Sequence, residues 1–582
     1  MSIDRKEKSQ KYKFLCYSIL IGITILLLIH SAFSFCQSDE PNYSSLLYRI
    51  YLGDALIRDE WHPTQFYSPV IYPFYLVFHF FSPDNTGIIL FFRILYTLFS
   101  FAVSICLFNN LITDYGCFPA IFGAIACLLY SRANINGCSY YKIAFLSVIL
   151  TLIFTKKSRA EDNRKLLFFS GICTAGSVFC NPYLILFALF NFLIVLFTYS
   201  GKKRKNAAFL YIGGFIISAA LYGFFLLSRA NLKELVKSML YIINEPSHIK
   251  VISDIWRNLK KQSYYLLIPN STVILAATSV IMVFLALKYN KRHPLFFSIY
   301  SILTILFTAR TIQNVSDGIC FGITYPLTLA FFPLAVYLFF SKQRDFAIYM
   351  YAAGLVNCIS WFLGSNTLLD AMTIGFTICS IAGILMLFRC TTTSAKSMTK
   401  TDMPYIIPAA GLCLIVLVIF FCTRIFGIYR DAPLEKLNTQ LEKGPAAGLR
   451  TTPEHSLEYN SIYDTIQEIY KDYPVETVMF AESLPWGYLC TNWKIGSFST
   501  WGQGFEHGWL EPYFRTHQNK IPSLIFLLEA SSGSYESAPF NSHKFHQTGN
   551  NDLPEGWFYD QLLSDAVVIL NNDYLTVFQA EK

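Results

Sequence analysis

Two adjacent carboxylates, Asp39 and Glu40, stand a few residues beyond the first long apolar run of the chain, which covers about 14–34. An apolar helix end at this position could be finished by Ser, Asn or Gly instead. The ordinary interpretation of the pair is a solvated helix terminus with two surface carboxylates. A carboxylate close to hydrocarbon can also take up a proton during a reaction. The position favours this chemical role.

Four cations in segments expected near the same side of the membrane predict a ligand of opposite charge. An Arg side chain suits phosphate because its planar fork binds two oxygens at once. Each cation alone is better explained as an interface residue with a snorkelling head group. As a set they must face something anionic, and a phosphate carried on a membrane lipid satisfies that need. The four are Arg58, Arg132, Lys142 and Arg310.

Composition indicates a membrane protein. Of the 582 residues, 54% are hydrophobic and only 14% charged, whereas soluble chains carry about a quarter charged residues. The net charge of +8 lies largely in clusters between apolar runs, which argues against nucleic-acid binding. Most of the 15 Cys lie in apolar runs without metal-ligand spacing. We expect no cofactor and no protein-built metal site, and any divalent ion would be held loosely by Asp39 and Glu40.

Apolar runs of about 17 or more residues, split at polar or Pro positions, predict about 13 transmembrane helices. Five of the six turns that follow even-numbered runs are basic, which predicts a cytoplasmic N-terminus and an extracytoplasmic C-terminus for a multi-pass plasma-membrane protein. The first run lacks a small-residue cleavage site, so we expect it to be retained as a span. The runs are 14–34, 69–109 (about 20 of its residues crossing), 117–131, 142–155, 166–181, 183–200, 207–228, 265–288, 295–309, 320–341, 346–363, 370–389 and 405–423.

Two of the expected outer loops are long, 35–68 and 229–264. Apolar residues between positions 46 and 57 have the spacing of an amphipathic helix lying in the membrane interface. The second loop is rich in Lys and Arg interleaved with apolar residues. A basic amphipathic segment at the membrane surface is a suitable holder for lipid phosphate.

Beyond the membrane domain, expected over 1–423, the composition becomes that of a soluble protein. Residues 424–460 predict a linker. Residues 461–582 predict a small extracytoplasmic α/β domain, because short apolar strands alternate with helices. Its expected elements are a helix at 461–471, a turn into a short helix at 484–491, and strands at 476–480, 524–528 and 566–570. The fold class is therefore a polytopic all-α membrane bundle with a C-terminal α/β domain.

This architecture resembles the GT-C class of integral-membrane glycosyltransferases, the group of the protein O-mannosyltransferases and the lipid A aminoarabinose transferases. The resemblance rests on Asp39-Glu40 at the start of the first outer loop and on the Pro-containing return through Tyr67-Ser-Pro-Val-Ile-Tyr-Pro-Phe. It implies that Asp39 is the catalytic carboxylate, with Glu40 as the alternative. Two features depart from the pattern: no Lys precedes the proline motif, and the segment 130–142 has no acidic residue.

The resemblance implies transfer of a hexose or pentose from a polyprenyl-phosphate donor to an envelope lipid, glycan or protein. Arg58, Arg132, Lys142 and Arg310 would hold the donor phosphate. The alternatives are a polysaccharide or lipid transporter or flippase, an inactive glycosyltransferase relative, and an accessory membrane protein that displays its outer domain. The transporter interpretation would be favoured by charged residues in the middle of several spans and by two halves that repeat each other. The sequence has almost none of the former and none of the latter.

Overall fold

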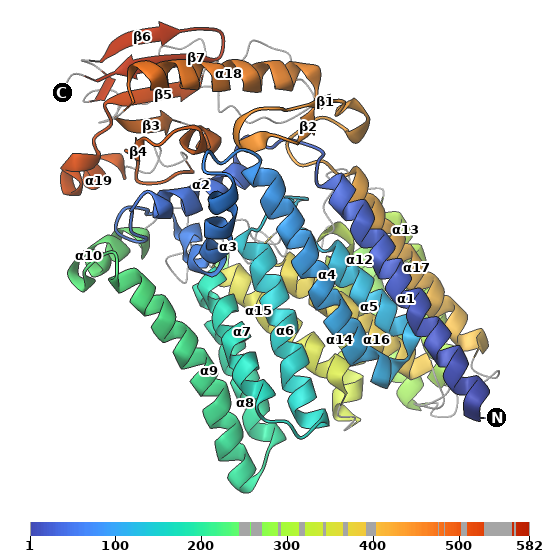
Figure 1. Cartoon of the computed structure of the whole chain (residues 1–582). Helices are drawn as coiled ribbons and strands as arrows, with labels where there is room; N and C mark the ends of the chain where they lie inside the picture. The colour runs from blue at the N-terminus through green and yellow to red at the C-terminus, as the bar shows by residue number, and fades with distance from the viewer. Residues whose placement is uncertain are drawn as a thin grey trace.

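The computed structural model describes residues 2–243, 256–257, 270–288, 293–312, 321–341, 345–364, 371–391, 403–474, 476–481, 484–501, 509–528, 562–563 and 566–580. Figure 1 shows a bundle of long helices with a smaller domain covering one end, and the N-terminus at the opposite end. We call the covered end the capped end. The expected helical bundle with a small C-terminal sheet is therefore present.

Within the described residues, a helix covers much of each expected apolar run. Seven of these helices, α1, α4, α9, α14, α15, α16 and α17, contain stretches long and apolar enough to cross a membrane. The count of about 13 spanning helices stays a prediction, because the other helices are shorter or less apolar. The bundle consists of α1 (Ser2–His30), α4 (Ile88–Tyr115), α5 (Cys117–Leu129), α6 (Tyr140–Ala160), α7 (Leu166–Cys180), α8 (Ile185–Thr198), α9 (Gly201–Leu227), α12 (Asn270–Lys288), α13 (His293–Ile312), α14 (Phe321–Phe340), α15 (Phe346–Leu363), α16 (Thr373–Thr391) and α17 (Met403–Phe426).

The expected run 69–109 forms two helices rather than one. The helix α3 (Ser68–Phe81) is separated from α4 by a turn in which Asn85 and Gly87 have positive φ angles of 58° and 77°. Residues in that left-handed region cannot continue a right-handed helix. The shorter α3 lies at the capped end beside α2 (Asp39–Tyr51) (Figure 1). Only α4 has the length and apolarity of a spanning helix.

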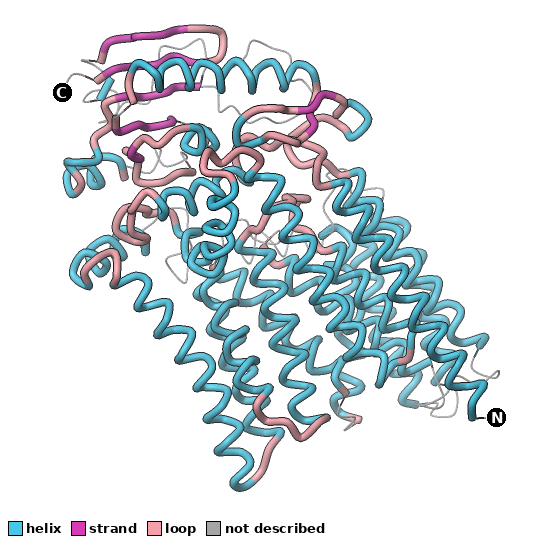
Figure 2. The backbone as a smooth tube through the Cα atoms, in the orientation of Figure 1, coloured by secondary structure: helices cyan, strands magenta, loops and turns pink. Residues whose placement is uncertain are grey.

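Basic turns lie at the end of the bundle opposite the cap, where the tube of Figure 2 shows short loops between helices. Lys157 and Arg159 stand in the last turn of α6, and Lys202–Lys205 in the first turns of α9. Lys203 pairs there with Asp162 at 3.0 Å. This distribution agrees with the expected orientation, which stays a prediction.

The spacing of apolar residues between 46 and 57 predicts a helix lying in the membrane interface, but α2 is instead covered by other parts of the chain. It begins at the acidic pair, and only Tyr51 of its residues is exposed. Its apolar side packs on the bundle, and its polar side bonds to the C-terminal domain. Ser45 Oγ donates to the Pro485 carbonyl at 2.6 Å, and Tyr48 Oη donates to the Thr491 carbonyl at 2.9 Å. The domain therefore satisfies polar groups that would otherwise need water.

The C-terminal domain contains a five-stranded mixed sheet with the order β4-β3-β5-β7-β6. Strand β3 pairs in parallel with β4 and β5, and β7 pairs antiparallel with β5 and β6. The three predicted strands correspond to β3, β5 and β6, whereas β4 and β7 were not predicted. The elements are α18 (Pro453–Asp472), β3 (Thr477–Ala481), η6 (Pro485–Cys490), β4 (Lys494–Ile495), α19 (Leu510–Thr516), η8 (Gln518–Lys520), β5 (Leu524–Leu528), β6 (Val567–Asn571) and β7 (Leu575–Gln579).

The segment 424–460, expected as a linker, is structured and packs on the bundle. It contains η4 (Leu434–Lys436), β1 (Thr439–Gln440), η5 (Gly444–Ala446), β2 (Arg450–Thr451) and the first turns of α18. The Gly87 N–H donates to the Gly444 carbonyl at 3.0 Å. Thr452 caps α18 by accepting from the His455 N–H, with Pro453 in the first turn. The C-terminal domain therefore begins before residue 461.

Candidate active site

The acidic pair occupies the first two positions of α2, so Asp39 and Glu40 stand where the helix N–H groups are unpaired. Carboxylates are stabilised at this end by the helix dipole. Ser38, the residue before the helix, makes no side-chain cap bond to the backbone. The two acidic side chains have separate sets of partners, and this difference decides what each can do.

Glu40 is fully engaged by Arg93 of α4. Arg93 Nε donates to Oε1 at 2.9 Å, and Nη2 donates to Oε2. The remaining nitrogen, Nη1, donates to the Ser31 and Phe33 carbonyls at 2.9 and 2.8 Å. Both side chains are almost completely buried. Such a two-point pair is directional and strong. It joins α2 to α4, and Arg93 extends the link to the residues that follow α1.

The loop before α6 closes over this pair. A Cβ placed on Gly137 would lie 3.3 Å from Oε1 of Glu40. Contact that tight would force the neighbour to shift, so a residue without a side chain lets the loop approach the carboxylate. The pair is thereby shielded from solvent on that side.

Asp39 is held through one oxygen only. Its Oδ2 accepts from Tyr429 Oη at 2.6 Å, from Arg430 Nη1 at 2.7 Å and from Ser38 Oγ at 3.3 Å. No described residue donates to Oδ1. The side chain keeps a relative exposure of 10%, against 3% for Glu40. Asp39 is thus the member of the pair whose carboxylate has an oxygen left for a substrate.

An aromatic wall adjoins Asp39. Tyr43, one turn further along α2, makes edge contacts with Tyr67 and Tyr140 at centroid distances of 5.9 and 6.2 Å. Burial raises the pKa of the Tyr43 phenol well above its usual range. Tyr140, Asp39 and Tyr67 raise it further, whereas Arg132 lowers it. Tyr43 is therefore a neutral hydroxyl whose pKa is affected both by Asp39 and by Arg132.

The predicted phosphate-binding cations do not gather at one place. Arg132 lies on the Tyr141 ring, with its guanidinium carbon 3.8 Å from the centroid, and belongs to the neighbourhood of Asp39 through Tyr43. Lys142 is completely buried, with Nζ 3.9 Å from the centre of the Tyr96 ring and no hydrogen-bond partner among the described residues. As placed, Lys142 cannot meet a ligand on the surface.

The other two predicted cations lie elsewhere. Arg58 pairs with Asp59 at 2.7 Å and approaches Glu234 at 3.8 Å, at the wall of a separate cavity. Arg310 falls in α13, but its side chain lies outside the described residues.

Three site residues were missed by sequence reasoning: Arg93, Tyr429 and Arg430. Arg93 carried a signal, since it is the only charged residue in the apolar stretch 88–109, and a charge inside a span marks a functional or paired group. Tyr429 and Arg430 follow directly after the last span, within the segment expected as a linker. Only the folded chain brings them to Asp39.

The C-terminal domain fixes the position of the loop that carries the acidic pair. Asp431 Oδ2 accepts the Phe35 N–H at 2.6 Å and the Thr451 hydroxyl at 2.9 Å, and Oδ1 lies 2.7 Å from Nδ1 of His455. Gln37 Nε2 donates to Glu458 Oε1 at 3.1 Å. These contacts join residues before α2 to α18.

At the other end of α2, Arg49 is a buried centre of hydrogen bonds. Its guanidinium donates to Asp54 and Glu60, each at 2.9 Å, and to the Asp59 carbonyl. It also donates to the Ser497 carbonyl at 2.7 Å and to Tyr513 Oη at 3.1 Å. The first loop and the C-terminal domain therefore share one buried polar network.

A metal site does not fit the acidic pair as it stands. Among the described residues no group of three or more His, Cys, Asp and Glu could hold a metal ion. Arg93 occupies both oxygens of Glu40, and Arg430 adds positive charge beside Asp39. One carboxylate oxygen is too few for a divalent cation, which prefers about six oxygen ligands.

Comparisons with known proteins give a distant likeness to solved structures. The sequence matches no protein-family model, and no curated protein matches it. Among solved structures, the oligosaccharyltransferase of Archaeoglobus fulgidus, crystallised with zinc and sulfate, is similar over 89% of this chain and 68% of its own. The identity is 12% and the TM-score 0.45. At these values the likeness concerns the path of the backbone and does not extend to individual residues.

Proposed function

We propose that this protein is a membrane glycosyltransferase that moves a sugar from a polyprenyl-phosphate donor to an envelope lipid, glycan or protein on the extracytoplasmic face. The asymmetry of the acidic pair carries the proposal. Glu40 is held at both oxygens by Arg93, whereas Asp39 keeps Oδ1 without a donor among the described residues. A carboxylate fixed through one oxygen and open at the other is arranged for proton transfer.

In the proposed reaction, an acceptor oxygen attacks the anomeric carbon while Oδ1 of Asp39 takes the acceptor's proton. The bond between the anomeric carbon and the phosphate oxygen breaks, and its electron pair leaves with the polyprenyl phosphate. Tyr429 and Arg430 keep the carboxylate in position through Oδ2. This step inverts the anomeric centre, uses the sugar donor and the acceptor as its two substrates, and needs no oxidant.

Positive charge near Asp39 would stabilise the departing phosphate. Arg430 is 23% exposed and lies directly beside the carboxylate. Arg132 is near enough to Tyr43 to lower the pKa of its phenol. Both are arginines, whose fork can hold two phosphate oxygens. Donors fixed in advance where charge develops are commonly the largest single contribution to catalysis. We assign these two residues, rather than Arg58 or Lys142, to the donor phosphate.

The test is release of free polyprenyl phosphate from a panel of labelled polyprenyl-phosphate sugars, with crude envelope lipids and glycans supplied as acceptors. The purified wild-type protein is compared with Asp39→Asn and Glu40→Gln. Loss of a general base predicts a fall of at least about a hundredfold for Asp39→Asn. Donor binding without turnover by the wild type would overturn the transferase and favour a transporter or an inactive relative.

A further inference from the structure

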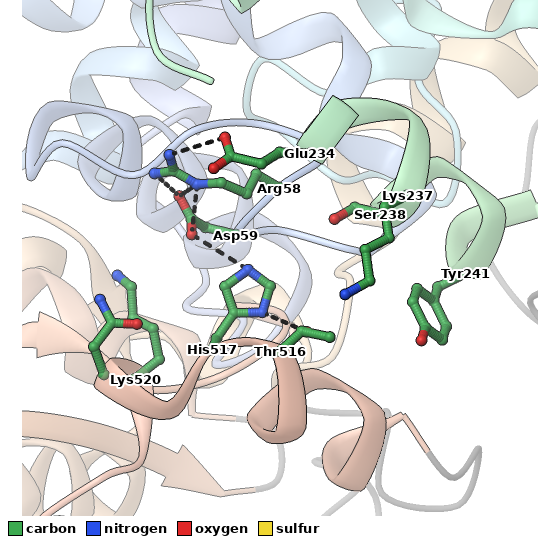
Figure 3. Close-up of a pocket in the computed structure, with 10 residues that line it drawn as sticks. Arg58, Asp59, Glu234, Lys237, Ser238, Tyr241, Thr516, His517 and Lys520 are labelled. Carbon is green, nitrogen blue, oxygen red and sulfur yellow. Dashed lines mark hydrogen bonds and ion pairs between the residues drawn. The ribbon is translucent and has the colours of Figure 1, made fainter. Parts of the chain in front are cut away.

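A second polar cavity lies between three parts of the chain, apart from Asp39. It has a volume of about 340 Å³ and is bounded by the first loop, by α10 (Leu232–Ile243) and by the end of α19 with η8. That volume is at the lower end of the range for small-molecule sites, about 300–1,000 Å³. Figure 3 shows its walls, formed by Arg58, Asp59, Glu234, Lys237, Ser238, Tyr241, Thr516, His517, Asn519 and Lys520.

The walls mix hydrogen-bond donors and acceptors, which argues against a bare anion as the ligand. Asp59 and Glu234 would repel a phosphate, and both already engage Arg58. Lys520 pairs with Asp54. In the described part of the chain, Lys237 is the only lining cation without a carboxylate partner. One such cation is a weak basis for binding a charged phosphate against two carboxylates.

A saccharide satisfies the same walls better. Each sugar hydroxyl both donates and accepts, and so it can pair with carboxylate, amide, hydroxyl and ammonium groups together. Tyr241 supplies a flat apolar surface for a sugar ring. Its ring is held in place by stacking on the buried Trp61, with a centroid distance of 4.5 Å and an interplanar angle of 9°. A fixed aromatic wall needs little ordering when a ligand arrives.

The floor of the cavity, α10, is amphipathic. Ser238 is buried on the cavity side, whereas Leu232, Val236 and Ile243 are more than half exposed. These three apolar residues fall on one face of the helix at a helical period. The helix follows α9, a candidate span, after a short turn and lies at the capped end, across the direction of α9 (Figure 1). Such a helix lies in the membrane interface with its apolar face toward lipid.

We propose that this cavity binds the saccharide head of a membrane glycolipid, whose chains remain in the bilayer beside α10. The binding of a glycolipid in this cavity does not depend on whether the protein has the proposed transferase activity. The further assignment of this lipid as the sugar acceptor rests on the proposed function. The same saccharide chemistry can also come from a water-soluble glycan, so the two sources need separate arms in the test.

The experiment uses the full chain in nanodiscs and measures retained ligand by native mass spectrometry. The probes are the glycolipid fraction extracted from the expression host's membranes and the glycans released from that fraction. Asn519→Trp fills the cavity from the side opposite α10 and begins from an exposed position. Gln518→Trp is the matched control, since Gln518 is the exposed neighbour and does not line the cavity.

We expect wild type and Gln518→Trp to retain glycolipid and Asn519→Trp to bind it at least about tenfold more weakly. Equal retention by Asn519→Trp, no retention by wild type, or displacement by sugar-free phosphatidylglycerol would overturn the site. Free glycan binding as tightly as glycolipid would support the saccharide site and overturn its lipid source. Asp39→Asn should retain glycolipid unchanged, so that a failure of turnover is distinguished from a failure of this site.

Discussion

Arg430 binds the carboxylate of Asp39, with Nη1 2.7 Å from Oδ2, although the two residues lie far apart in the sequence. The next residue, Asp431, accepts the backbone N–H of Phe35, four positions before Asp39. One dipeptide thus holds both the candidate catalytic side chain and the loop that carries it. The residues after α17 are therefore part of the candidate site, with a role beyond connecting two domains.

Replacing Arg430 should weaken donor binding more than it disturbs the fold. Arg430→Gln removes the charge that we assign to the donor phosphate, so its KM for donor should rise about tenfold or more, which corresponds to about 1.4 kcal/mol. Arg430→Lys keeps the positive charge but not the planar fork of a guanidinium, so its KM for donor should lie between those of the wild type and Arg430→Gln. Steady-state kinetics of polyprenyl phosphate release measure this. The exposed Arg515→Gln is the control, and an unchanged KM for Arg430→Gln would remove Arg430 from the donor site.

Glu40 and Arg93 should behave as structural partners. Glu40→Gln leaves the Arg93 guanidinium buried without its counter-charge, and breaking one side of such a pair costs about 3–5 kcal/mol. We expect a clearly lower thermal midpoint, followed by fluorescence in detergent. Asp464→Asn, in the exposed pair with Lys443, should change little. A Glu40→Gln variant that melts like wild type and is inactive would instead make Glu40 the chemical residue.

Asp431 should be needed to hold the segment 424–460 in place against the first loop. Asp431→Ala removes an acceptor shared by Phe35, Thr451 and His455. It leaves a buried N–H unpaired, which costs about 1–3 kcal/mol for each such group. We expect faster proteolysis within 424–460 and reduced turnover. Glu435→Ala, an exposed position in the same segment, should be cut at the wild-type rate. Equal rates for both variants would contradict the role of Asp431.

His517 should make stability depend on pH in mildly acidic solution. Burial lowers its pKa below the usual 6.5, and Arg49 and Arg58 act in the same direction. The Tyr513 carbonyl and Asp59 act against this shift. The unfolded chain therefore binds more protons than the folded one below about pH 6.5, so stability is lost as pH falls through that value.

The measurement is the thermal midpoint between pH 7.5 and 5.5. The wild-type midpoint should fall more steeply than that of His517→Gln, which cannot take up the proton. Parallel curves for the two proteins would contradict the assignment. Carboxyl groups with ordinary pKa values titrate below this window, which separates their contribution from that of His517.

The sequence predicts the elements that depend on neighbouring residues, but not the contacts between segments that lie far apart along the chain. Long apolar runs such as 207–228 became helices because burial and backbone pairing act within each segment. The run 69–109 divided at Ser82–Gly87, where Asn85 and Gly87 adopt left-handed angles that hydrophobicity alone does not report. Strand 524–528 was correct to the residue, whereas β7 was not predicted.

The acidic pair was found because its charge is unusual beside an apolar run. Its partners were not, since Arg93 lies in the next span and Arg430 beyond the last. No periodic pattern links such positions. The interfacial helix was misplaced for a related reason: a half-apolar helix packs equally well on lipid or on a domain, and the C-terminal domain covers α2 here.

The buried network around Arg49 has a consequence for biosynthesis. Its acceptors at Ser497 and Tyr513 are made hundreds of residues after α2, so Arg49 lacks these two partners while the chain between them is being synthesised. The network around Arg49 can therefore close only after the chain has been synthesised as far as Tyr513. Quality control of this chain would therefore act on its C-terminal domain, whereas the candidate catalytic residues Asp39 and Glu40 belong to the first loop.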